Sequence, residues 1–447
     1  MNVKGMQPSQ SAEGLVFQAN ARKHLFLTNG SRVYTLPEDI AKTLEETLVE
    51  SSTSEFERQL SDYGLSRQPY ISDTPLRAVP LHNVSLAIAQ KCNLGCKYCY
   101  ASGGNFGQAE KNMPIEIAKQ SIDRVLENVK PNERCNIAYM GGEPLINRSL
   151  LREITDYALQ QASLKKVHST FSITTNGTLL TQADAEFFEE HGFAVTLSLD
   201  GIEEVHNLLR PFKGGRGSYS RIMKRVQPLL DLQHKMQVSA RITVTPLNLD
   251  LRKSLDWFIE QGFHSVGFSP MLSSPNGQLE MSPKALQNML ARLIECADEF
   301  EQQTIAGKRY PFTNIAGALQ EIHKGTHRPY PCGAGAGYMG VSAEGDFVAC
   351  HRFVGDRERV LGSSSKGVDA ARQANWLAQR HVDTQSPCSE CWARYLCGGG
   401  CHHEVISKGR PACDFIRGWL KHCLGVYVTL QERRPDFFQS FKNDNAK

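Results

Sequence analysis

The chain has 447 residues, of which 40% are hydrophobic and 22% charged, a composition that is ordinary for a globular protein and excludes a fibrous or disordered chain. Fifty Lys and Arg residues against 47 Asp and Glu residues give a formal net charge of +3, which does not favour nucleic acid as a partner. The sequence begins without the apolar core of a signal peptide, and no later run resembles a membrane span. We therefore expect a soluble cytoplasmic protein without a membrane partner, whose 13 cysteines serve as metal ligands or catalytic groups rather than as disulfides.

Residues 1–80 contain no cysteine and differ in pattern from the rest of the chain. The runs LVFQAN and KHLFLTNGSRVYTL predict strands, and the Asn29-Gly30 pair predicts a hairpin turn. EDIAKTLEETLV predicts a helix. We expect a small N-terminal α+β module that ends in the polar, Pro-marked stretch before residue 81.

Residues 81–305 repeat a β-α unit. Six apolar runs, among them VSLAIAQ, NIAYMGG and AVTLSLDG, alternate with amphipathic segments. This pattern predicts an α/β fold, a partial (β/α)6 barrel of parallel strands with its active site at their carboxyl ends. We expect a linker over 306–330, a Cys-rich domain over 331–425, and a C-terminal helix or tail over 426–447.

Three cysteines lie within eight residues, directly after the first of these strands. They are Cys92, Cys96 and Cys99. Three thiolates on one loop suit a four-iron cluster and leave one iron open for another ligand. A zinc site completed by a distant residue, or a loop of reduced cysteines, is the alternative.

This loop resembles the C-x3-C-x2-C motif of the radical S-adenosylmethionine (radical SAM) superfamily, in which an aromatic residue, here Tyr98, precedes the last cysteine. The resemblance implies a [4Fe-4S] cluster whose open iron binds the methionine part of S-adenosylmethionine (AdoMet). One-electron reduction would cleave AdoMet to a 5′-deoxyadenosyl radical, which abstracts hydrogen. It also implies an electron donor such as a flavodoxin or a ferredoxin.

The ends of the following strands carry further polar residues. Gly141-Gly142-Glu143 resembles the GGEP motif, which implies a contact with the methionine ammonium. The next two strand ends place their polar side chains on one face by alternation, where the family contacts the carboxylate and ribose of AdoMet. With Tyr98, the expected cofactor-binding residues are Gly141, Gly142, Glu143, Ser172, Thr174, Asn176, Ser198 and Arg210.

Two of these strand-end residues admit a second interpretation. Arg210 resembles an arginine that lies near the cofactor carboxylate, but a solvated surface arginine is equally compatible with the sequence. Asp200 is the nearest candidate for a catalytic base that accepts a thiol proton, although a ribose contact explains it as well.

The C-terminal cysteines are arranged in closely spaced pairs, which suit either zinc or iron-sulfur sites. Their order resembles the SPASM extension of radical SAM peptide-modifying enzymes, written C-x9–15-G-x4-C, then C-x2-C-x5-C-x3-C, then C. The resemblance implies two auxiliary [4Fe-4S] clusters, and so three clusters in all. The resemblance also implies the ligands of each auxiliary cluster: for the first, Cys332, Cys350 and Cys401, and for the second, Cys388, Cys391, Cys397 and Cys413.

The remaining cysteines have no such spacing. Cys423 could complete the first auxiliary cluster, but its helical spacing with apolar neighbours favours a buried core thiol. Cys135 and Cys296 are expected in the core. Three histidines beside predicted ligands are either hydrogen-bond donors to the clusters or exposed loop residues: His351, His402 and His403.

The resemblance covers about residues 83–425. CHRFVG and CGGGCHHEVISKGRPACDFIRGW resemble most the maturation enzymes of quinohemoprotein amine dehydrogenase, which implies thioether links between Cys sulfur and Asp or Glu side-chain carbon in a small protein. The N-terminal module resembles domains that hold a leader peptide along a sheet edge. The alternatives are a sulfatase-activating enzyme that forms formylglycine, a peptide-cyclophane enzyme, and a non-catalytic zinc scaffold.

Overall fold

The computed structural model describes residues 11–50, 53–65, 74–325, 327–439 and 441. The chain forms two compact units, each of which gathers segments distant in sequence. The sheet unit comprises residues 76–285 and 333–377, and the cysteine-rich unit comprises residues 1–75, 286–332 and 378–447. Within the described ranges, no helix combines the length and apolar composition needed to cross a membrane.

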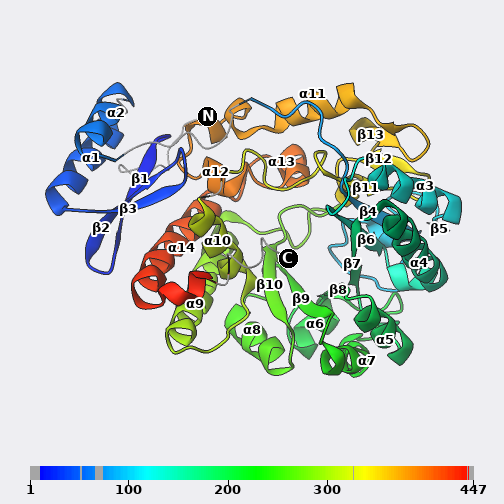
Figure 1. The fold of residues 1–447 in the computed structure, drawn as a ribbon. Coiled ribbons are helices and arrows are strands. Elements are labelled where there is room, and N and C mark those ends of the chain that lie inside the picture. The colour runs from blue at the N-terminus through cyan, green and yellow to red at the C-terminus, as the bar shows by residue number, and fades with distance from the viewer. Residues whose placement is uncertain (1–10, 51–52, 66–73, 326, 440, 442–447) are drawn as a thin grey trace. The chain divides into compact units, whose positions relative to one another are not determined.

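The sheet unit is built on an eleven-stranded, mostly parallel sheet that does not close (Figure 1). Its six central strands pair in parallel in the order β10-β9-β8-β7-β6-β4, so the predicted partial (β/α)6 barrel is confirmed as an open α/β sheet. These strands are β4 (Asn83–Gln90), β6 (Arg134–Gly141), β7 (His168–Thr175), β8 (Ala194–Ser198), β9 (Gln237–Val244) and β10 (Ser265–Pro270).

Beyond β4, the sheet continues into the start of the predicted Cys-rich domain. Strand β11 (Tyr338–Val341) pairs in parallel with β4, and β12 (Asp346–Val348), β13 (Val360–Ser363) and β14 (Gly367–Val368) follow in antiparallel order. The short β5 (Lys111–Asn112) pairs with the end of β4. The first part of the Cys-rich sequence is therefore an extension of the central sheet.

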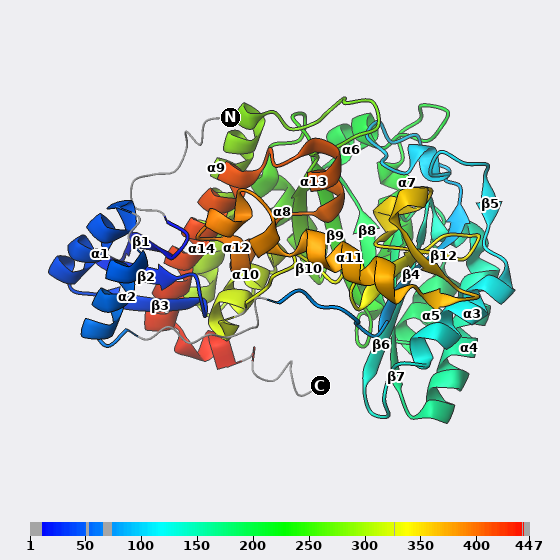
Figure 2. The same cartoon turned by 90° about the horizontal axis from the view of Figure 1, so that it is seen from above.

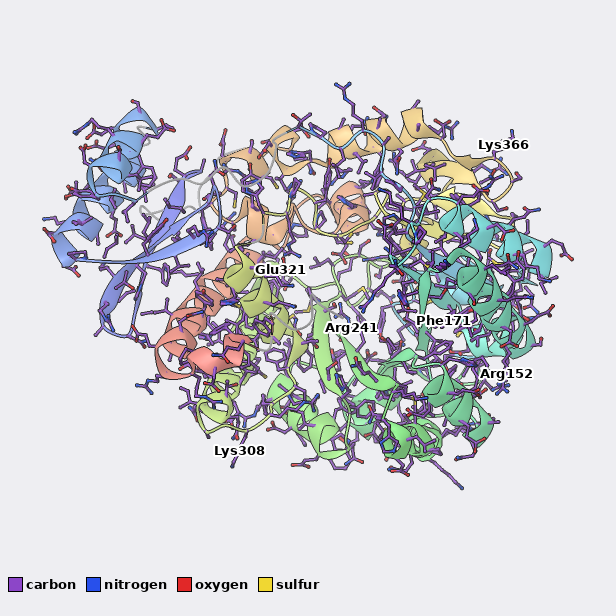
Figure 3. All side chains as sticks on the ribbon, in the orientation of Figure 1. Arg152, Phe171, Arg241, Lys308, Glu321 and Lys366 are labelled. Carbon is purple, nitrogen blue, oxygen red and sulfur yellow. The ribbon has the colours of Figure 1, made fainter. Side chains whose placement is uncertain are left out.

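Helices cover the outer face of the sheet, as Figures 1 and 2 show. Buried apolar side chains alternate with more exposed polar ones along β7, where Phe171 is one of the buried residues (Figure 3 labels it). A capping box between Thr181 and Asp184 begins α5. The helices are α3 (Ile115–Leu126), α4 (Arg148–Lys165), α5 (Gln182–Glu190), α6 (Glu203–Leu209), α7 (Tyr219–Leu232) and α8 (Leu251–Glu260).

In the cysteine-rich unit, the N-terminal residues form a three-stranded antiparallel sheet of β1 (Gly14–Ala19), β2 (Arg22–Leu27) and β3 (Arg32–Leu36). The predicted hairpin turn is confirmed, and Gly30 in it has a φ of 88°. Helices α1 (Glu38–Glu50) and α2 (Thr53–Asp62) pack on this sheet.

The N-terminal sheet is joined to the C-terminal part of the same unit by specific contacts. Phe26 packs edge-on against Trp392, with ring centroids 5.9 Å apart, and the Thr28 hydroxyl donates to the Trp392 carbonyl over 3.1 Å. Arg22 forms an ion pair of 2.7 Å with Glu432 of α14 (Cys413–Arg433). The N-terminal module is thus part of a larger core.

The rest of the unit is helical, and the predicted linker over 306–330 contains the helix α10. The other helices are α9 (Pro283–Ile305), α10 (Thr313–Lys324), α11 (Ala370–Arg380), which spans both units, α12 (Arg394–Cys397) and α13 (His402–Lys408). The domain boundaries drawn on the sequence otherwise stay predictions. The sheet unit contains the 3-10 helices η1 (Ser102–Gly104), η2 (Pro144–Asn147), η3 (His351–Phe353) and η4 (Arg357–Arg359), and the cysteine-rich unit contains η5 (Val382–Thr384), η6 (Cys388–Glu390) and η7 (Pro435–Gln439).

Candidate active site

The cluster loop, residues 91–100, follows the carboxyl end of β4. Burial raises the pKa of the Cys92 thiol, and it raises the pKa of Cys96 to about 12 although the Arg210 cation acts in the opposite direction. The charge of Cys99 acts in the same direction on the pKa of both thiols, to a smaller extent than burial does.

The donor set of the cluster loop suits an iron-sulfur cluster, because three thiolates can bind three irons of a four-iron cluster and leave the fourth iron open. Among the residues that the structure describes, no group of three His, Cys, Asp or Glu side chains is arranged to hold a single metal ion. The Leu94 amide and the Asn176 side chain donate to Cys92 Sγ over 3.4 and 3.6 Å, as suits a thiolate ligand.

The two glycines of the GGEP motif bring the end of β6 against the cluster loop. Gly142 N donates to Ala89 O over 2.8 Å, and a Cβ on Gly142 would lie 2.4 Å from Lys91 O and 2.6 Å from Gly104 Cα. A Cβ on Gly104 would in turn lie 2.6 Å from Cys92 Cβ. The absence of a side chain at these glycines therefore allows the protein's own backbone to approach closely.

Glu143 is fully buried, and its carboxylate joins two strand ends. One oxygen accepts from the Thr175 hydroxyl over 2.7 Å and from the Leu145 amide over 3.0 Å, and the other accepts from the Asn176 amide over 2.7 Å. Burial raises the pKa of Glu143 to about 6, against these hydrogen bonds, which lower it. The observed contacts are structural, so an ammonium contact of Glu143 stays a prediction.

The residues predicted on β7 separate into two groups. Asn176, just after the strand, donates to Asn93 of the cluster loop over 3.0 Å and so lies at the site. Thr174 lies half-buried on the inner face of the sheet. Ser172 is lower in the strand, where it accepts a hydrogen bond of 3.3 Å from Asn136 of β6. Only Asn176 of these three contacts the cluster loop in the described contacts.

Asp200, Tyr98 and Arg210 form one buried group. The Tyr98 hydroxyl donates to Asp200 Oδ2 in a short hydrogen bond, and Arg210 Nε donates to the same oxygen over 2.9 Å. The other carboxylate oxygen accepts from the Thr243 amide over 3.1 Å. The Arg210 guanidinium also stacks on the Tyr98 ring and reaches to 4.0 Å from Cys96 Sγ.

This geometry bears on two expectations. The side chain of Arg210 is only 12% exposed, so the surface-arginine interpretation is wrong. Asp200 is fully buried, and both of its oxygens accept hydrogen bonds from protein donors. It orients Arg210 and Tyr98 beside the cluster loop, and its role as a catalytic base stays a prediction.

Two functional candidates were missed by the sequence analysis. His206 supports the Asp200 group, because it accepts from the Asp200 amide over 3.3 Å, and burial lowers its pKa to about 3, so it is neutral. Arg241 stands on β9 in register with Ser198, another predicted residue, which is half-buried on β8. Arg241 is an exposed cation on the polar face of the sheet and contacts Ser269 (Figure 3). Its signal was a lone charge within the apolar run VSARITVTP.

In the cysteine-rich unit, the four cysteines expected to bind the second auxiliary cluster lie near one another. The pKa of Cys388 is raised to about 12, mainly by burial and to a smaller extent by the charges of Cys397, Cys413 and Cys391. Arg410 lowers it, which favours the ionised ligand. This electrostatic proximity fits the ligand set implied by the resemblance, but the cluster itself stays a prediction.

The backbone conformation between Cys397 and Cys401 explains why three glycines stand there. Gly398, Gly399 and Gly400 have φ values of 73°, 91° and 78°, a left-handed path that ends α12 and turns the chain back. A Cβ on Gly398 would lie 2.4 Å from Pro331 N. Residues with a side chain would strain this turn between two predicted ligands.

The predicted first auxiliary ligands belong to both units: Cys350 is in the sheet unit, and Cys332 and Cys401 are in the cysteine-rich unit. Their shared cluster stays a prediction. The core assignment of the remaining cysteines is confirmed, since each is buried: Cys135, Cys296 and Cys423.

The histidines beside predicted ligands are not exposed loop residues. His402 is buried and accepts from Arg380 over 3.2 Å, and burial lowers its pKa to about 3. His351 is half-buried and shares a hydrogen bond of 2.9 Å with the Tyr338 hydroxyl. His403 is half-buried as well.

Comparisons with known proteins agree with this site. The family described as the radical SAM superfamily matches residues 86–258. An uncharacterized protein of Methanocaldococcus jannaschii is 30% identical over 204 residues, which are 45% of this chain and 67% of that protein. The cysteine-type anaerobic sulfatase-maturating enzyme of Clostridium novyi is 25% identical over 71% of this chain and 86% of its own length. The solved structure "Native anSMEcpe with bound AdoMet and Cp18Cys peptide" has a similar fold, with a TM-score of 0.63 and 21% identity over 79% of this chain and 99% of that one.

Proposed function

The chain belongs to the radical SAM superfamily, and from this premise we propose that it is a maturase that oxidises a side chain within a peptide or small protein. The observation that carries the proposal is the inner face of the open sheet. Inner positions of a closed barrel are usually filled by apolar side chains. Here they include Thr174, Ser198 and Arg241, which are polar and partly exposed.

The comparisons support a peptide or protein as the substrate class. A sulfatase-maturating enzyme matches most of this chain, and a solved structure of the same fold contains AdoMet and a peptide. When bound, the [4Fe-4S] cluster and AdoMet supply the radical that removes hydrogen from the substrate. The chain's own part is to hold the cluster through Cys92, Cys96 and Cys99 and to orient Arg210 through Asp200.

For the product, we propose a thioether link between a Cys sulfur and the side-chain carbon of an Asp or Glu. Arg241 supports this choice, because a guanidinium binds a carboxylate with two donors and would hold the acidic residue of the substrate on the inner face. Forming the link removes one hydrogen atom from the carbon, which the radical derived from AdoMet would accept. The thiol loses a proton to the solvent, and the remaining electron would pass to one of the predicted auxiliary clusters. The product is then lighter by two hydrogens per link.

Formylglycine formation is the second candidate, supported by the similarity to the cysteine-type sulfatase-maturating enzyme. It needs a substrate cysteine but no acidic neighbour. The cysteine would lose its sulfur as sulfide and gain an oxygen from water. The two products therefore differ in mass and in sulfide release.

The test uses the full-length, iron-loaded enzyme under anaerobic conditions, with two peptides that differ only in an Asp or its Asn replacement near the Cys. We expect a product lighter by two hydrogens from the Asp peptide alone. Arg241→Gln should raise the KM of that peptide about tenfold or more, because it removes a charge-assisted contact of about 1.5–3 kcal/mol. Arg134→Gln, an exposed arginine at the opposite end of the strands, is the matched control.

Mass spectrometry and sulfide assays distinguish the outcomes. Sulfide release from both peptides would contradict the thioether proposal and support formylglycine formation. An Arg241→Gln enzyme with an unchanged KM would remove Arg241 from the substrate site. A colourless protein that contains zinc after anaerobic purification would contradict the enzyme proposal altogether.

A further inference from the structure

A basic pocket lies on the sheet unit around the start of α7, with a volume of about 1060 Å³. Its lining contains four cations, Arg216, Arg221, Lys224 and Arg225, and one carboxylate, that of Glu203. The pocket is therefore strongly positive, although the chain as a whole carries a formal charge of only +3. Nothing in the proposed chemistry on the inner face uses this charge.

Two of these cations are engaged with the protein, and two are available to a partner. Arg221 Nε donates to Thr178 O over 3.2 Å, and Arg225 donates to a nearby backbone oxygen over 2.5 Å. Arg216 and Lys224 are exposed, and neither forms an ion pair with any residue that the structure describes. An anionic partner would find these two charges unneutralised.

The pocket adjoins the segment that pairs with the cluster loop. Phe212, which lines the pocket, forms a β-bridge with Leu94, and Gly95 N donates to Pro211 O over 2.8 Å. The Phe212 ring also lies under the guanidinium of Arg216 at 5.3 Å. The segment of residues 211–212 therefore contacts the cluster loop, and its Phe212 also lines the pocket.

A chain of hydrogen bonds also connects the pocket to a cysteine ligand. Thr178 accepts from Arg221 through its carbonyl, and its hydroxyl accepts from Asn93 Nδ2 over 2.8 Å. Asn93 is the neighbour of Cys92 and accepts from Asn176, which in turn donates to Cys92 Sγ over 3.6 Å. The pocket is the outer end of the polar network around the cluster loop.

We infer that this pocket is the docking site of the electron donor, a one-electron carrier protein with an acidic surface around its redox centre. Opposite charges steer such a carrier and fix its orientation, and short-range contact beside the cluster loop suits electron transfer. In the step, the reduced carrier loses one electron and the oxidised cluster gains it. No bond forms or breaks and no proton moves.

The inference rests on the radical SAM chemistry and not on the peptide product proposed above. An electron carrier has to bind close to the cluster loop. Other anionic occupants, such as an acidic segment of the substrate or a small phosphate compound, do not have to bind there. They are treated as outcomes of the test.

The test compares the wild-type enzyme with the double variant Arg216→Glu/Lys224→Glu, both loaded with iron and AdoMet but without substrate. Reduced flavodoxin is the acidic carrier, and dithionite is a small reductant that needs no docking site. The charge-matched control carries Lys235→Glu and Lys253→Glu, which also change the net charge by −4, on two exposed lysines that do not line the pocket. Stopped-flow absorbance and electron paramagnetic resonance follow cluster reduction, and calorimetry measures flavodoxin binding.

With flavodoxin at low ionic strength, we expect the double variant to reduce its cluster about tenfold or more slowly and to bind flavodoxin more weakly. The difference should shrink as salt is added. Dithionite should reduce wild-type enzyme, double variant and control at the same rate.

Equal rates of wild type and double variant with flavodoxin would overturn the inference. If the cluster of the double variant is reduced slowly by both reductants, the neutral variant Arg216→Gln/Lys224→Gln is measured next. The inference then requires that flavodoxin reduces this variant slowly while dithionite reduces it at the wild-type rate. An unchanged flavodoxin rate with weakened peptide or phosphate binding would overturn the inference and assign the pocket to that ligand. Because no substrate is present, failure of the proposed maturase product does not affect this test.

Discussion

The two cysteine regions are positioned by different kinds of structure. Around the cluster loop, Gly142, Asn176 and Asp200 each follow the end of a parallel strand, so the sheet itself brings them to one edge. In the cysteine-rich unit, Cys388 lies on a 3-10 helix and Cys413 begins α14, so turns and helix ends set the spacing. A site at strand ends follows from topology, whereas a site at turns depends on local conformation.

The largest expected effect tests whether the two regions are separate iron sites. Replacing Cys92, Cys96 and Cys99 by Ala should abolish AdoMet cleavage and leave about two-thirds of the iron, since two of three predicted clusters would survive. Iron analysis and an assay for 5′-deoxyadenosine measure the two quantities on one sample. Loss of all iron would show that the regions assemble together, and retained cleavage would refute the cluster assignment.

A smaller effect is expected behind the cluster loop, where Asp200→Asn breaks a buried ion pair and leaves Arg210 with an uncompensated charge. The expected loss is about 3–5 kcal/mol in the stability of the sheet unit, measured by thermal unfolding. AdoMet binding should weaken in parallel, and Asp200→Glu should restore part of it. A catalytic base would behave differently: its loss would remove a limb of the pH–rate profile and leave AdoMet affinity intact.

The smallest effect concerns the close approach of backbone at the GGEP motif. Gly142→Ala should cost about 1–3 kcal/mol, because its Cβ would meet Lys91 O and Gly104. Gly214→Ala is the control, since a Cβ there meets nothing within 4 Å. Equal melting temperatures of the two variants would mean that the loop yields easily and that strand ends do not hold it rigidly.

The sequence predicted the part of the site that local pattern determines. The run FSITTNG predicted that Asn176 follows a strand, which is β7, and the run VSLAIAQ predicted a strand directly before the cysteine loop, which is β4. The pairing of Asp200 with Tyr98 joins residues 102 positions apart, and no periodicity reports such a contact. For that reason, the sequence did not show that Asp200 is the buried ion-pair partner of Arg210.

For the fold too, the sequence predicted what local pattern determines and missed contacts between residues distant in sequence. The β-α repeat predicted six parallel strands, and all six are present. The sequence did not show that β11 joins β4, because its partner lies some 250 residues earlier and its own run is only four residues long. A run this short carries too little alternation to be distinguished from a loop.

The burial of Trp392 against Phe26 has a consequence for how the protein is made. Trp392 is fully buried, and it adjoins Cys391, a predicted ligand of the second auxiliary cluster. On the ribosome, the N-terminal sheet emerges first but meets Trp392 and α14 only when nearly the whole chain has been synthesised. A cluster bound by Cys391 and its neighbours would therefore be enclosed only late in synthesis, whereas the strands around the cluster loop, residues 83–270, are complete much earlier.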